Sequence, residues 1–385
     1  MRMLYSFGYF LDDPGGHVIH SVKFCEAFEK AGHEIKLIGP VRKFTADQRE
    51  HILPEWVIPV KGWNNAFHLA LKLRKALANQ ALQWKPDFLY VRPALKDTLA
   101  IHWAAGAGIP LFVEINVLTF HEHFRSGRFL KAFLSHIIEK WELKHSQGII
   151  CITEEIARMI KSRIKNTKPI CVTGNGFDPE EIPLASFNTS ARDELDTPES
   201  AKVILFAGTL EPAEGLDLLL PVLKDIKDLY LWIIGEGKEK SKLKDLANKL
   251  GITPRMRWLQ WIRSEDLFAY LEAADFGIAS LAAVRKNMNE AQSMKVRTFL
   301  GAGLPVLIGY DDTRLRKDLP WIKKVNAIAP GEINGAIKEL LSQPVRDITY
   351  RKQIREFAKK VLSWDTIANE TIPFIKSVLR TDCSG

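Results

Sequence analysis

The chain has 385 residues, and 54 lysines and arginines against 46 aspartates and glutamates give it a formal net charge of +8. Hydrophobic residues make up 46% and charged residues 26%, which excludes a disordered, collagen-like or disulfide-scaffold chain. At roughly 150 residues per domain, this length predicts two or three domains, each able to bury a core.

The four cysteines, Cys25, Cys151, Cys171 and Cys383, are widely spaced and form no CxxC or Cys/His cluster. This spacing argues against structural zinc and fits a reducing compartment. No run reaches the ~18 apolar residues of a membrane span. The short apolar N-terminus meets Asp12–Gly16 without a signal-peptide cleavage site. We therefore expect a cytoplasmic protein, at most bound to the inner face of the plasma membrane.

Short apolar runs alternate with longer amphipathic runs in both halves of the chain, and this alternation predicts parallel sheets covered by helices on both faces. The expected strands of the first half are Met3–Tyr9, Glu34–Ile38, Phe88–Val91, Pro110–Ile115, Gly148–Ile152 and Pro169–Val172. Those of the second half are Val203–Ala207, Tyr230–Ile234, Arg257–Leu259, Phe276–Ala279 and Val306–Ile308. The expected helices include Val18–Ala31, Phe129–His145, 215–227, 239–250, 264–273 and 294–302.

The alternation starts afresh after the loop-rich stretch 175–200. We therefore predict an α/β fold of two doubly wound, Rossmann-like domains, 1–178 and 200–362. In such sheets ligands bind beyond the carboxyl ends of the strands, so two facing domains would place the site in the cleft between them.

Three glycine-containing turns follow expected strands. The first contains Gly15 and Gly16 before a helix, where backbone N–H groups favour an anion, although a plain tight turn explains it equally well. The second is Gly208–Gly215. The third contains Gly235 and Gly237 but lacks the last glycine of GxGxxG, so a plain turn is the simpler interpretation.

A polar loop and a helix start together near residue 290. Ser293 is the expected N-cap of a helix that begins near Met294 and ends before Gly303. Glu290 and Gln292 then lie just before the helix N-terminus, where a carboxylate can bind sugar hydroxyls and free N–H groups can bind phosphate. Alternatively, Glu290 only complements the helix dipole.

The ordered set of segments resembles the GT-B glycosyltransferases, specifically the large family 4 of retaining enzymes that use nucleotide-sugar donors. The segments are PDFLYVRPA at 86–94, GIPLFVEIN at 108–116, ICITEEI at 150–156, GNGFD at 174–178, LEAADFGIASL at 271–281 and GAGLPV at 301–306. The resemblance covers nearly the whole chain. It implies a C-terminal helix, about 365–380, that crosses back to the first domain.

The family signature is a glutamate, seven residues and a second glutamate. The first matches Glu290, which the resemblance places near the reacting centre, and the second falls on Thr298. A threonine cannot accept two hydrogen bonds from a ribose diol as a carboxylate does. A variant subgroup carries Ser-Pro-x-Lys here, and Lys295 matches its lysine, with Ser293 and Met294 as a shortened lead-in.

The loop at 208–215 departs from the family in a second way. Family members usually place Arg and Lys there as a clamp on the donor diphosphate, but the matching positions are Thr209 and Glu214. Glu214 in place of a cation turns an attraction for the diphosphate into a repulsion, and each of these two terms is roughly 3 kcal/mol at about 5 Å in a dielectric near 20.

A local group of cations, Arg285, Lys286, Lys295 and Arg297, is a hypothetical replacement for this clamp. The alternative is that these are solvated surface charges. Replacement of Lys295 and Arg285 by alanine would separate the two interpretations.

The resemblance further implies transfer with retained anomeric configuration, no metal, and a diphosphate held over Gly16 and the helix that begins near Met294. Asn116 takes a place often held by His or Asn near the donor sugar. His121, Glu122 and His123 are acceptor-side candidates, although such residues are more often structural.

Two basic amphipathic stretches point to the acceptor. Residues 63–85 contain no acid, and residues 125–141 carry basic side chains among Phe129, Phe133 and Ile137. Such surfaces can lie on anionic membranes, which would suit a lipid-linked or glycan acceptor in cell-envelope or polysaccharide synthesis. The alternative is a pair of ordinary core-facing helices with solvated lysines.

Two other classes of function stay open. The departures at Thr209, Glu214 and Thr298 suggest a catalytically degenerate GT-B protein that acts as a binding or scaffold partner. A pI near 9.1 prompts a nucleic-acid binder, but the sequence carries no recognition motif for one.

Overall fold

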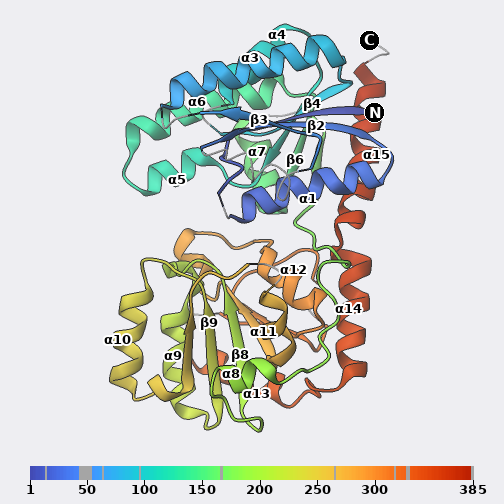
Figure 1. Cartoon of the computed structure of the whole chain (residues 1–385). Helices are drawn as coiled ribbons and strands as arrows, with labels where there is room; N and C mark the ends of the chain where they lie inside the picture. The colour runs from blue at the N-terminus through green and yellow to red at the C-terminus, as the bar shows by residue number, and fades with distance from the viewer. Residues whose placement is uncertain are drawn as a thin grey trace. The chain divides into compact units, whose positions relative to one another are not determined.

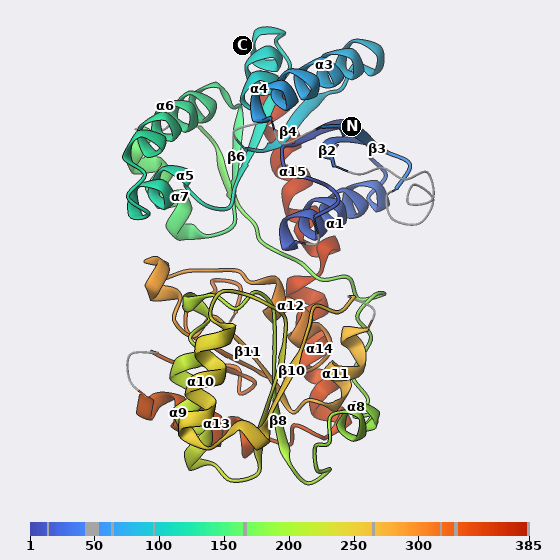
Figure 2. The same ribbon diagram turned by 60° about the vertical axis from the view of Figure 1, so that its left-hand side comes forward.

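The computed structural model describes residues 1–382 except 14, 43–53, 63–64, 95–96, 165–167, 264–265, 316–317 and 327–329. The chain forms two compact units, drawn in Figures 1 and 2. Unit 1 contains Met1–Gly174 and Ile367–Gly385, and unit 2 contains Asn175–Thr366. Residues 175–178, which we assigned to the first domain, and residues 179–199, which we placed between the domains, therefore belong to unit 2.

Unit 1 is built on a parallel seven-stranded sheet with the order β3-β2-β1-β4-β5-β6-β7. Met3 pairs with Phe88, and Leu89 pairs with Leu111. The strands are β1 (Arg2–Phe7), β2 (Glu34–Val41), β3 (Val57–Lys61), β4 (Phe88–Arg92), β5 (Leu111–Ile115), β6 (Gly148–Cys151) and β7 (Ile170–Val172). The helices are α1 (Gly16–Lys30), α3 (Ala66–Trp84), α4 (Thr98–Gly106), α5 (Thr119–Arg125), α6 (Phe129–His145), α7 (Glu154–Ile164) and α15 (Trp364–Asp382).

Helices cover both faces of this sheet because successive strand residues point to opposite sides. On one face Leu4 and Leu89 join a core supplied by α3, α4, α6 and α7. The other face is aromatic: the ring of Tyr90 packs at a tilt against that of Phe24 of α1, with ring centroids 5.0 Å apart. Figure 1 shows α3 and α4 above the sheet and α1 below it.

Unit 2 repeats this plan on a parallel six-stranded sheet with the order β10-β9-β8-β11-β12-β13. Its strands are β8 (Lys202–Ala207), β9 (Leu229–Ile234), β10 (Met256–Leu259), β11 (Phe276–Ala279), β12 (Val306–Ile308) and β13 (Ile322–Lys324). Its helices are α8 (Ser190–Glu194), α9 (Leu216–Asp225), α10 (Lys240–Leu250), α11 (Leu267–Ala273), α12 (Met294–Gly301), α13 (Pro330–Leu341) and α14 (Ile348–Leu362), with short 3-10 turns at Pro212–Glu214, Thr253–Arg255 and Ala283–Lys286.

The two faces of this second sheet have separate cores. Val203 and Leu205 pack with α11, α12 and α14, whereas Ile204 and Phe206 pack with α9, α10 and α13. Two doubly wound parallel-sheet units confirm the predicted fold class. In the described part of the chain, no helix is both long enough and apolar enough to span a membrane.

Two edge strands were absent from the prediction. In β3 Pro59 interrupts the apolar pattern, and proline is tolerated there because β3 lies at the edge of the sheet. In β13 only three residues pair, and two of them are lysines. Neither strand carries a pattern that distinguishes it from a loop.

Candidate functional site

The candidate donor site of unit 2 lies at the carboxyl ends of parallel strands. The loops after β8, β9, β11 and β12 share this edge of the sheet because all the strands run in one direction. The structure therefore brings together predicted site residues that lie far apart in sequence. They are Gly208, Thr209 and Glu214 after β8, Gly235 after β9, and Glu290 to Thr298 after β11.

The glycine loops after β8 and β9 pack backbone against backbone. Gly208 has φ +151° and Gly235 has φ +138°, and a Cβ on Gly235 would lie 2.0 Å from the carbonyl oxygen of Gly208. This close approach requires glycine at position 235, and the positive φ angle favours glycine at both positions. Thr209 follows directly and is exposed.

Glu214 and Lys295 form an ion pair, with the carboxylate oxygen 2.6 Å from Nζ. The same carboxylate accepts hydrogen bonds from the backbone N–H and the hydroxyl of Ser280, at 3.1 and 3.0 Å. Burial lowers the pKa of Lys295, and the attraction of Glu214 opposes that effect. The ammonium also lies against Gly208, 3.2 Å from where a Cβ would be. The pair therefore places a cation beside the glycine loop.

The N-terminus of α12 is open at this edge. Ser293 has the extended conformation of an N-cap, but its side chain makes no capping hydrogen bond. The first N–H groups of the helix, from Met294 onward, thus have no side-chain cap and favour an anion through the helix dipole. Met294 and Thr298 are half-buried.

Glu290 is fixed through its backbone. It forms a parallel bridge with Asp311, in the segment that follows β12. The N–H of Ala291 donates to the Asp311 carbonyl at 3.0 Å, and the Asp311 N–H donates to the Asn289 carbonyl at 2.8 Å. The half-buried Glu290 side chain thus projects from a loop held at both ends.

Two predicted donor-site roles are corrected by burial. Arg297 is 0% exposed and pairs with Asp312, and it also donates to the Asn175 carbonyl at 3.0 Å. Gln292 is 3% exposed, and its side-chain oxygen accepts from Arg297 at 2.8 Å. Both side chains hold the loop in place and are not available to a donor. The turn at Gly174–Asp178 supports this loop, because the Asn175 carbonyl accepts a hydrogen bond from Arg297.

Arg285 is also engaged. It forms a two-pronged ion pair with Asp217, with both N–O distances at 2.8 Å, and it donates to the Pro212 carbonyl. This arrangement fastens the turn after β11 to the start of α9. Arg285 is therefore a structural residue, and Lys295 is the predicted cation that lies against Gly208.

In unit 1 the Gly15–Gly16 turn opens α1, as predicted. Gly15 is the N-cap, without a side chain to cap the helix, and Gly16 is exposed. His17, which was not among the predicted site residues, follows in the first turn, with a buried Nε2 that has no hydrogen-bond partner among the described residues. Burial lowers the pKa of His17, and Arg92 adds to the effect.

Asn116 follows β5 at the carboxyl edge of the same sheet. Its Oδ1 atom is buried without a hydrogen-bond partner among the described residues, so this acceptor is available to water or to a ligand. Just before it, Glu114 lies 2.8 Å from both the Nε2 of His20 and the hydroxyl of Tyr90. Burial alone would raise the pKa of Glu114, but these contacts and the charge of Arg92 lower it to about 2.

The acceptor-side candidates lie on α5. His121 and His123 are half-buried, and His121 meets the ring of Phe120 edge-on. The side chain of Glu122 is outside the described residues. The backbone carbonyl of His123 accepts from the Arg128 N–H, which closes the turn toward α6. Their role stays a prediction.

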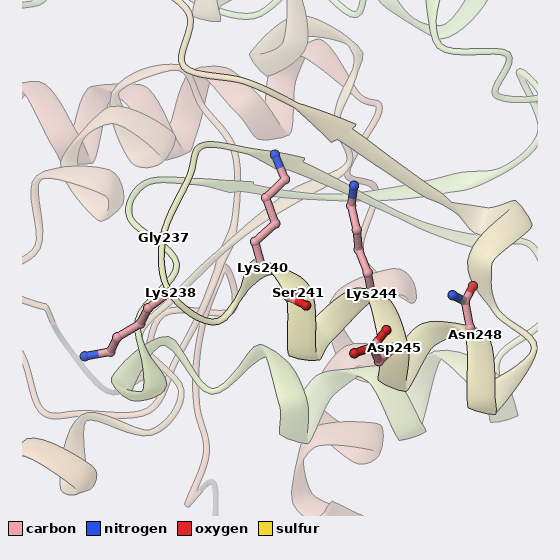
Figure 3. A pocket seen from close by; sticks show the side chains of 7 residues that line it. All are labelled: Gly237, Lys238, Lys240, Ser241, Lys244, Asp245 and Asn248. Atoms are coloured by element: carbon pink, nitrogen blue, oxygen red, sulfur yellow. The ribbon is translucent and has the colours of Figure 1, made fainter.

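A hollow beside α10 is lined by Gly237 of the third glycine turn and by no other residue of the predicted site. Figure 3 shows its lining: Gly237, Lys238, Lys240, Ser241, Lys244, Asp245 and Asn248. Its lysines are already engaged: Lys238 pairs with Glu211 at 2.7 Å, Lys240 pairs with Glu236, and Lys244 lies over the Trp258 ring. We assign it no role.

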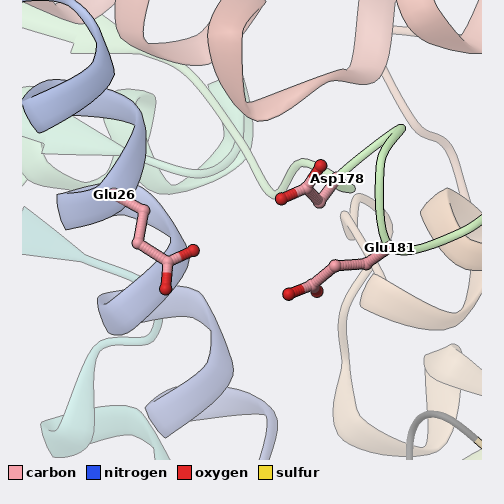
Figure 4. Close-up of side chains that lie close together, drawn as sticks. All are labelled: Glu26, Asp178 and Glu181. Carbon is pink, nitrogen blue, oxygen red and sulfur yellow. The ribbon is translucent and has the colours of Figure 1, made fainter. Parts of the chain in front are cut away.

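Three carboxylates, those of Glu26, Asp178 and Glu181, are drawn in Figure 4. Glu26 is on α1 of unit 1, whereas the other two follow β7 and belong to unit 2. Because the three are divided between the units, we assign no metal site to them.

Both units of the chain match models of glycosyltransferase families. Residues 14–181 match the family model described as Glycosyltransferase Family 4, and residues 187–319 match Glycosyl transferases group 1. The chain is 23% identical over 239 residues to the lipopolysaccharide core biosynthesis glycosyltransferase LpsD of Rhizobium meliloti (strain 1021). The matched region covers 55% of this chain and 64% of LpsD.

Solved structures show the same fold at low identity. Sucrose-phosphate synthase from Thermosynechococcus elongatus has a TM-score of 0.77 at 14% identity, over 99% of this chain and 100% of that one. Alr3699/HepE of Anabaena, in complex with UDP and glucose, has a TM-score of 0.75 at 14% identity, over 98% and 100%.

The fold and the two sequence matches define the class: this chain belongs to the GT-B, family 4-like glycosyltransferases. The chain covers less than two thirds of the length of the first three curated relatives, namely 64%, 26% and 63%.

Proposed function

We propose that the chain is a retaining glycosyltransferase that moves a sugar from a nucleotide-sugar to a glycan or lipid-linked acceptor in cell-envelope or polysaccharide synthesis. The observation that carries the proposal is the Lys295 ammonium, held against the glycine loop at the open N-terminus of α12. A cation, free N–H groups and a side-chain-free loop are together suited to a diphosphate.

The names of related proteins support the same class of donor and pathway. LpsD is named for lipopolysaccharide core biosynthesis, and Alr3699/HepE was solved with UDP and glucose and with UDP-glucose. We therefore take UDP-glucose as the first donor to test.

In the proposed reaction the acceptor hydroxyl attacks the anomeric carbon from the face that the diphosphate leaves. The bond from that carbon to the phosphate oxygen breaks as the bond to the acceptor oxygen forms, and the hydroxyl proton passes to the departing phosphate. Lys295 and the α12 N–H groups stabilise the charge on the leaving group. Glu290 contacts the sugar. We expect no metal.

A thermal-unfolding screen with UDP, GDP, ADP, CMP and their sugars tests donor binding first. A ligand at a hundred times its dissociation constant stabilises the fold by about 2.7 kcal/mol. Any ligand that raises the melting temperature is then assayed for release of the free nucleotide. Loss of release in Glu290→Gln, with binding kept, supports the assigned role; full activity in this variant removes Glu290 from the mechanism.

The departures at Thr209 and Thr298 favour a second candidate, a degenerate GT-B protein that binds a partner without turnover. Thr209 is exposed beside the glycine loop and offers no positive charge there. Absence of a melting shift with every nucleotide would favour this candidate over the transferase.

A further inference from the structure

The strongest unexplained surface lies on α5 and α6 of unit 1. Of the fifteen exposed large hydrophobic side chains among the described residues, six lie between residues 124 and 137. We call them the α6 patch: Phe124, Phe129, Leu130, Phe133, Leu134 and Ile137, which are 49% to 75% exposed. In Figures 1 and 2 the helices α5 and α6 lie together at the left of unit 1. Concentrated apolar exposure of this kind marks an interaction surface.

The patch is a continuous stripe. At 100° per residue, positions 129, 133 and 137 of α6 share one side of the helix, and 130 and 134 adjoin it. The rings of Phe124 and Phe129 meet edge-on, 5.5 Å apart, which joins α5 to the stripe.

The stripe points away from the core of unit 1. The buried residues of α6 are Ala132, Glu139, Glu142 and Leu143, which lie on the opposite side of the helix. The core therefore accounts for one face of α6 and leaves the apolar face uncovered. This differs from an ordinary amphipathic helix, whose second face is polar.

The exposed charged side chains of α6, whose residues are all described, are positive. Lys140 and Lys144 continue the exposed side of α6, and Arg128 and Lys131 flank its start; all four are exposed. The residues of α6 are described throughout, and its acids, Glu139 and Glu142, are both buried. The surface therefore combines large apolar side chains with exposed cations and exposes no acid on that helix.

We infer that the α6 patch is a docking surface for an anionic lipid bilayer. Apolar side chains enter the acyl boundary, while the lysines and Arg128 meet phospholipid headgroups. A second copy of the chain fits less well, because two copies joined through this patch would bring their cations together without acidic partners from α6. The inference goes beyond sugar transfer, and its test needs neither donor nor acceptor.

Vesicle sedimentation of the full chain tests the inference. We expect binding to vesicles of equal phosphatidylcholine and phosphatidylglycerol, and much weaker binding to phosphatidylcholine alone. Leu130→Ser and the double variant Leu130→Ser/Phe133→Ser should lose binding progressively. Replacement of Lys131, Lys140 and Lys144 by glutamine should reduce anionic-vesicle binding on the order of 100-fold.

The matched control is Ile348→Ser, which replaces an apolar residue that is 42% exposed in unit 2. It should bind as the wild type does. All variants are checked for an unchanged melting temperature, and Leu130→Ser alone, at the most exposed position, suffices if the double variant unfolds. Wild-type failure to bind anionic vesicles, or equal binding by Leu130→Ser, overturns the proposal. So does a wild-type dimer without lipid that Leu130→Ser converts to a monomer, since a second copy then covers the patch.

Discussion

Glu214 and Lys295 are 2.6 Å apart, so the acid that stands where the family usually has a cation is neutralised by a lysine from α12. The negative charge of Glu214 in the loop after β8 is therefore balanced by Lys295. The ammonium of this lysine is the positive group that lies beside Gly208, where the family has a cation from the loop itself. This arrangement explains how a donor diphosphate could be tolerated despite Glu214.

The two members of this pair should change donor binding in opposite directions. Lys295→Ala removes the cation and exposes the Glu214 carboxylate, so affinity for UDP or UDP-glucose should fall by about 100-fold. Glu214→Gln keeps an acceptor for Ser280 and releases the full charge of Lys295, so affinity should rise. Isothermal titration calorimetry measures both. Lys242→Ala, which breaks the exposed Lys242–Glu239 pair on α10, is the control and should have no effect. Equal weakening by both variants would show that the pair only supports the fold.

Asn116→Ala should separate stability from activity. The Oδ1 atom makes no hydrogen bond among the described residues, so its loss leaves no native partner unsatisfied and the melting temperature should hold or rise. If the amide binds the donor sugar, turnover should drop at least about tenfold, the worth of roughly one hydrogen bond. Parallel melting and nucleotide-release assays measure the two effects. Asn79→Ala, on the exposed side of α3, is the control. A large fall in melting temperature would reassign Asn116 to the fold.

Arg297→Met should destabilise unit 2 strongly. The guanidinium is fully buried and pairs with Asp312, while it also binds Asn175 and Gln292. Removal of one member of a buried ion pair costs about 3–5 kcal/mol because the other charge is left without a partner. Denaturant unfolding measures the loss. Arg263→Met, which breaks an exposed pair with Asp266, should cost under about 1 kcal/mol. Similar losses in both variants would contradict the structural role assigned to Arg297.

Periodicity and turn residues were sufficient to predict the strands that pair inside each sheet. Phe276–Ala279 and Val306–Ile308 have their expected bounds, because central parallel strands are apolar throughout. The edge strand β3 was not predictable from the same signal, since Pro59 breaks the pattern and only the neighbouring β2 shows that the segment pairs.

The sequence predicted which residues surround the candidate site, but it did not predict which of their side chains contact one another. Sequence spacing identified Glu290, Ser293 and Lys295 because they surround a helix start. It could not distinguish the buried Arg297 from Lys295, which is two residues earlier on the same helix, because burial depends on which side of α12 meets β11 and α14. The Glu214–Lys295 pair joins residues 81 positions apart, and only the neighbouring positions of β8 and β11 in the sheet bring them together. The clue available from the sequence was an acid, Glu214, where the family usually has a cation, together with a lysine, Lys295, that matches the variant subgroup.

Glu142, on the buried side of α6, should make the protein less stable as pH rises. Burial raises the pKa of its carboxyl to about 8, and the nearby Asp97 and Glu139 add to the effect. Between the ordinary value of 4.5 and about 8, the folded chain holds one more proton at this site than the unfolded chain. The free energy of unfolding therefore falls with increasing pH, by at most about 1.4 kcal/mol per pH unit from this group. Glu142→Gln cannot ionise and should flatten this slope, with its gain over the wild type greatest near pH 8. Urea unfolding at pH 6, 7 and 8 compares the two proteins, with Glu356→Gln on the exposed side of α14 as control. Parallel slopes for wild type and Glu142→Gln would mean that Glu142 is ionised in the folded chain throughout this range.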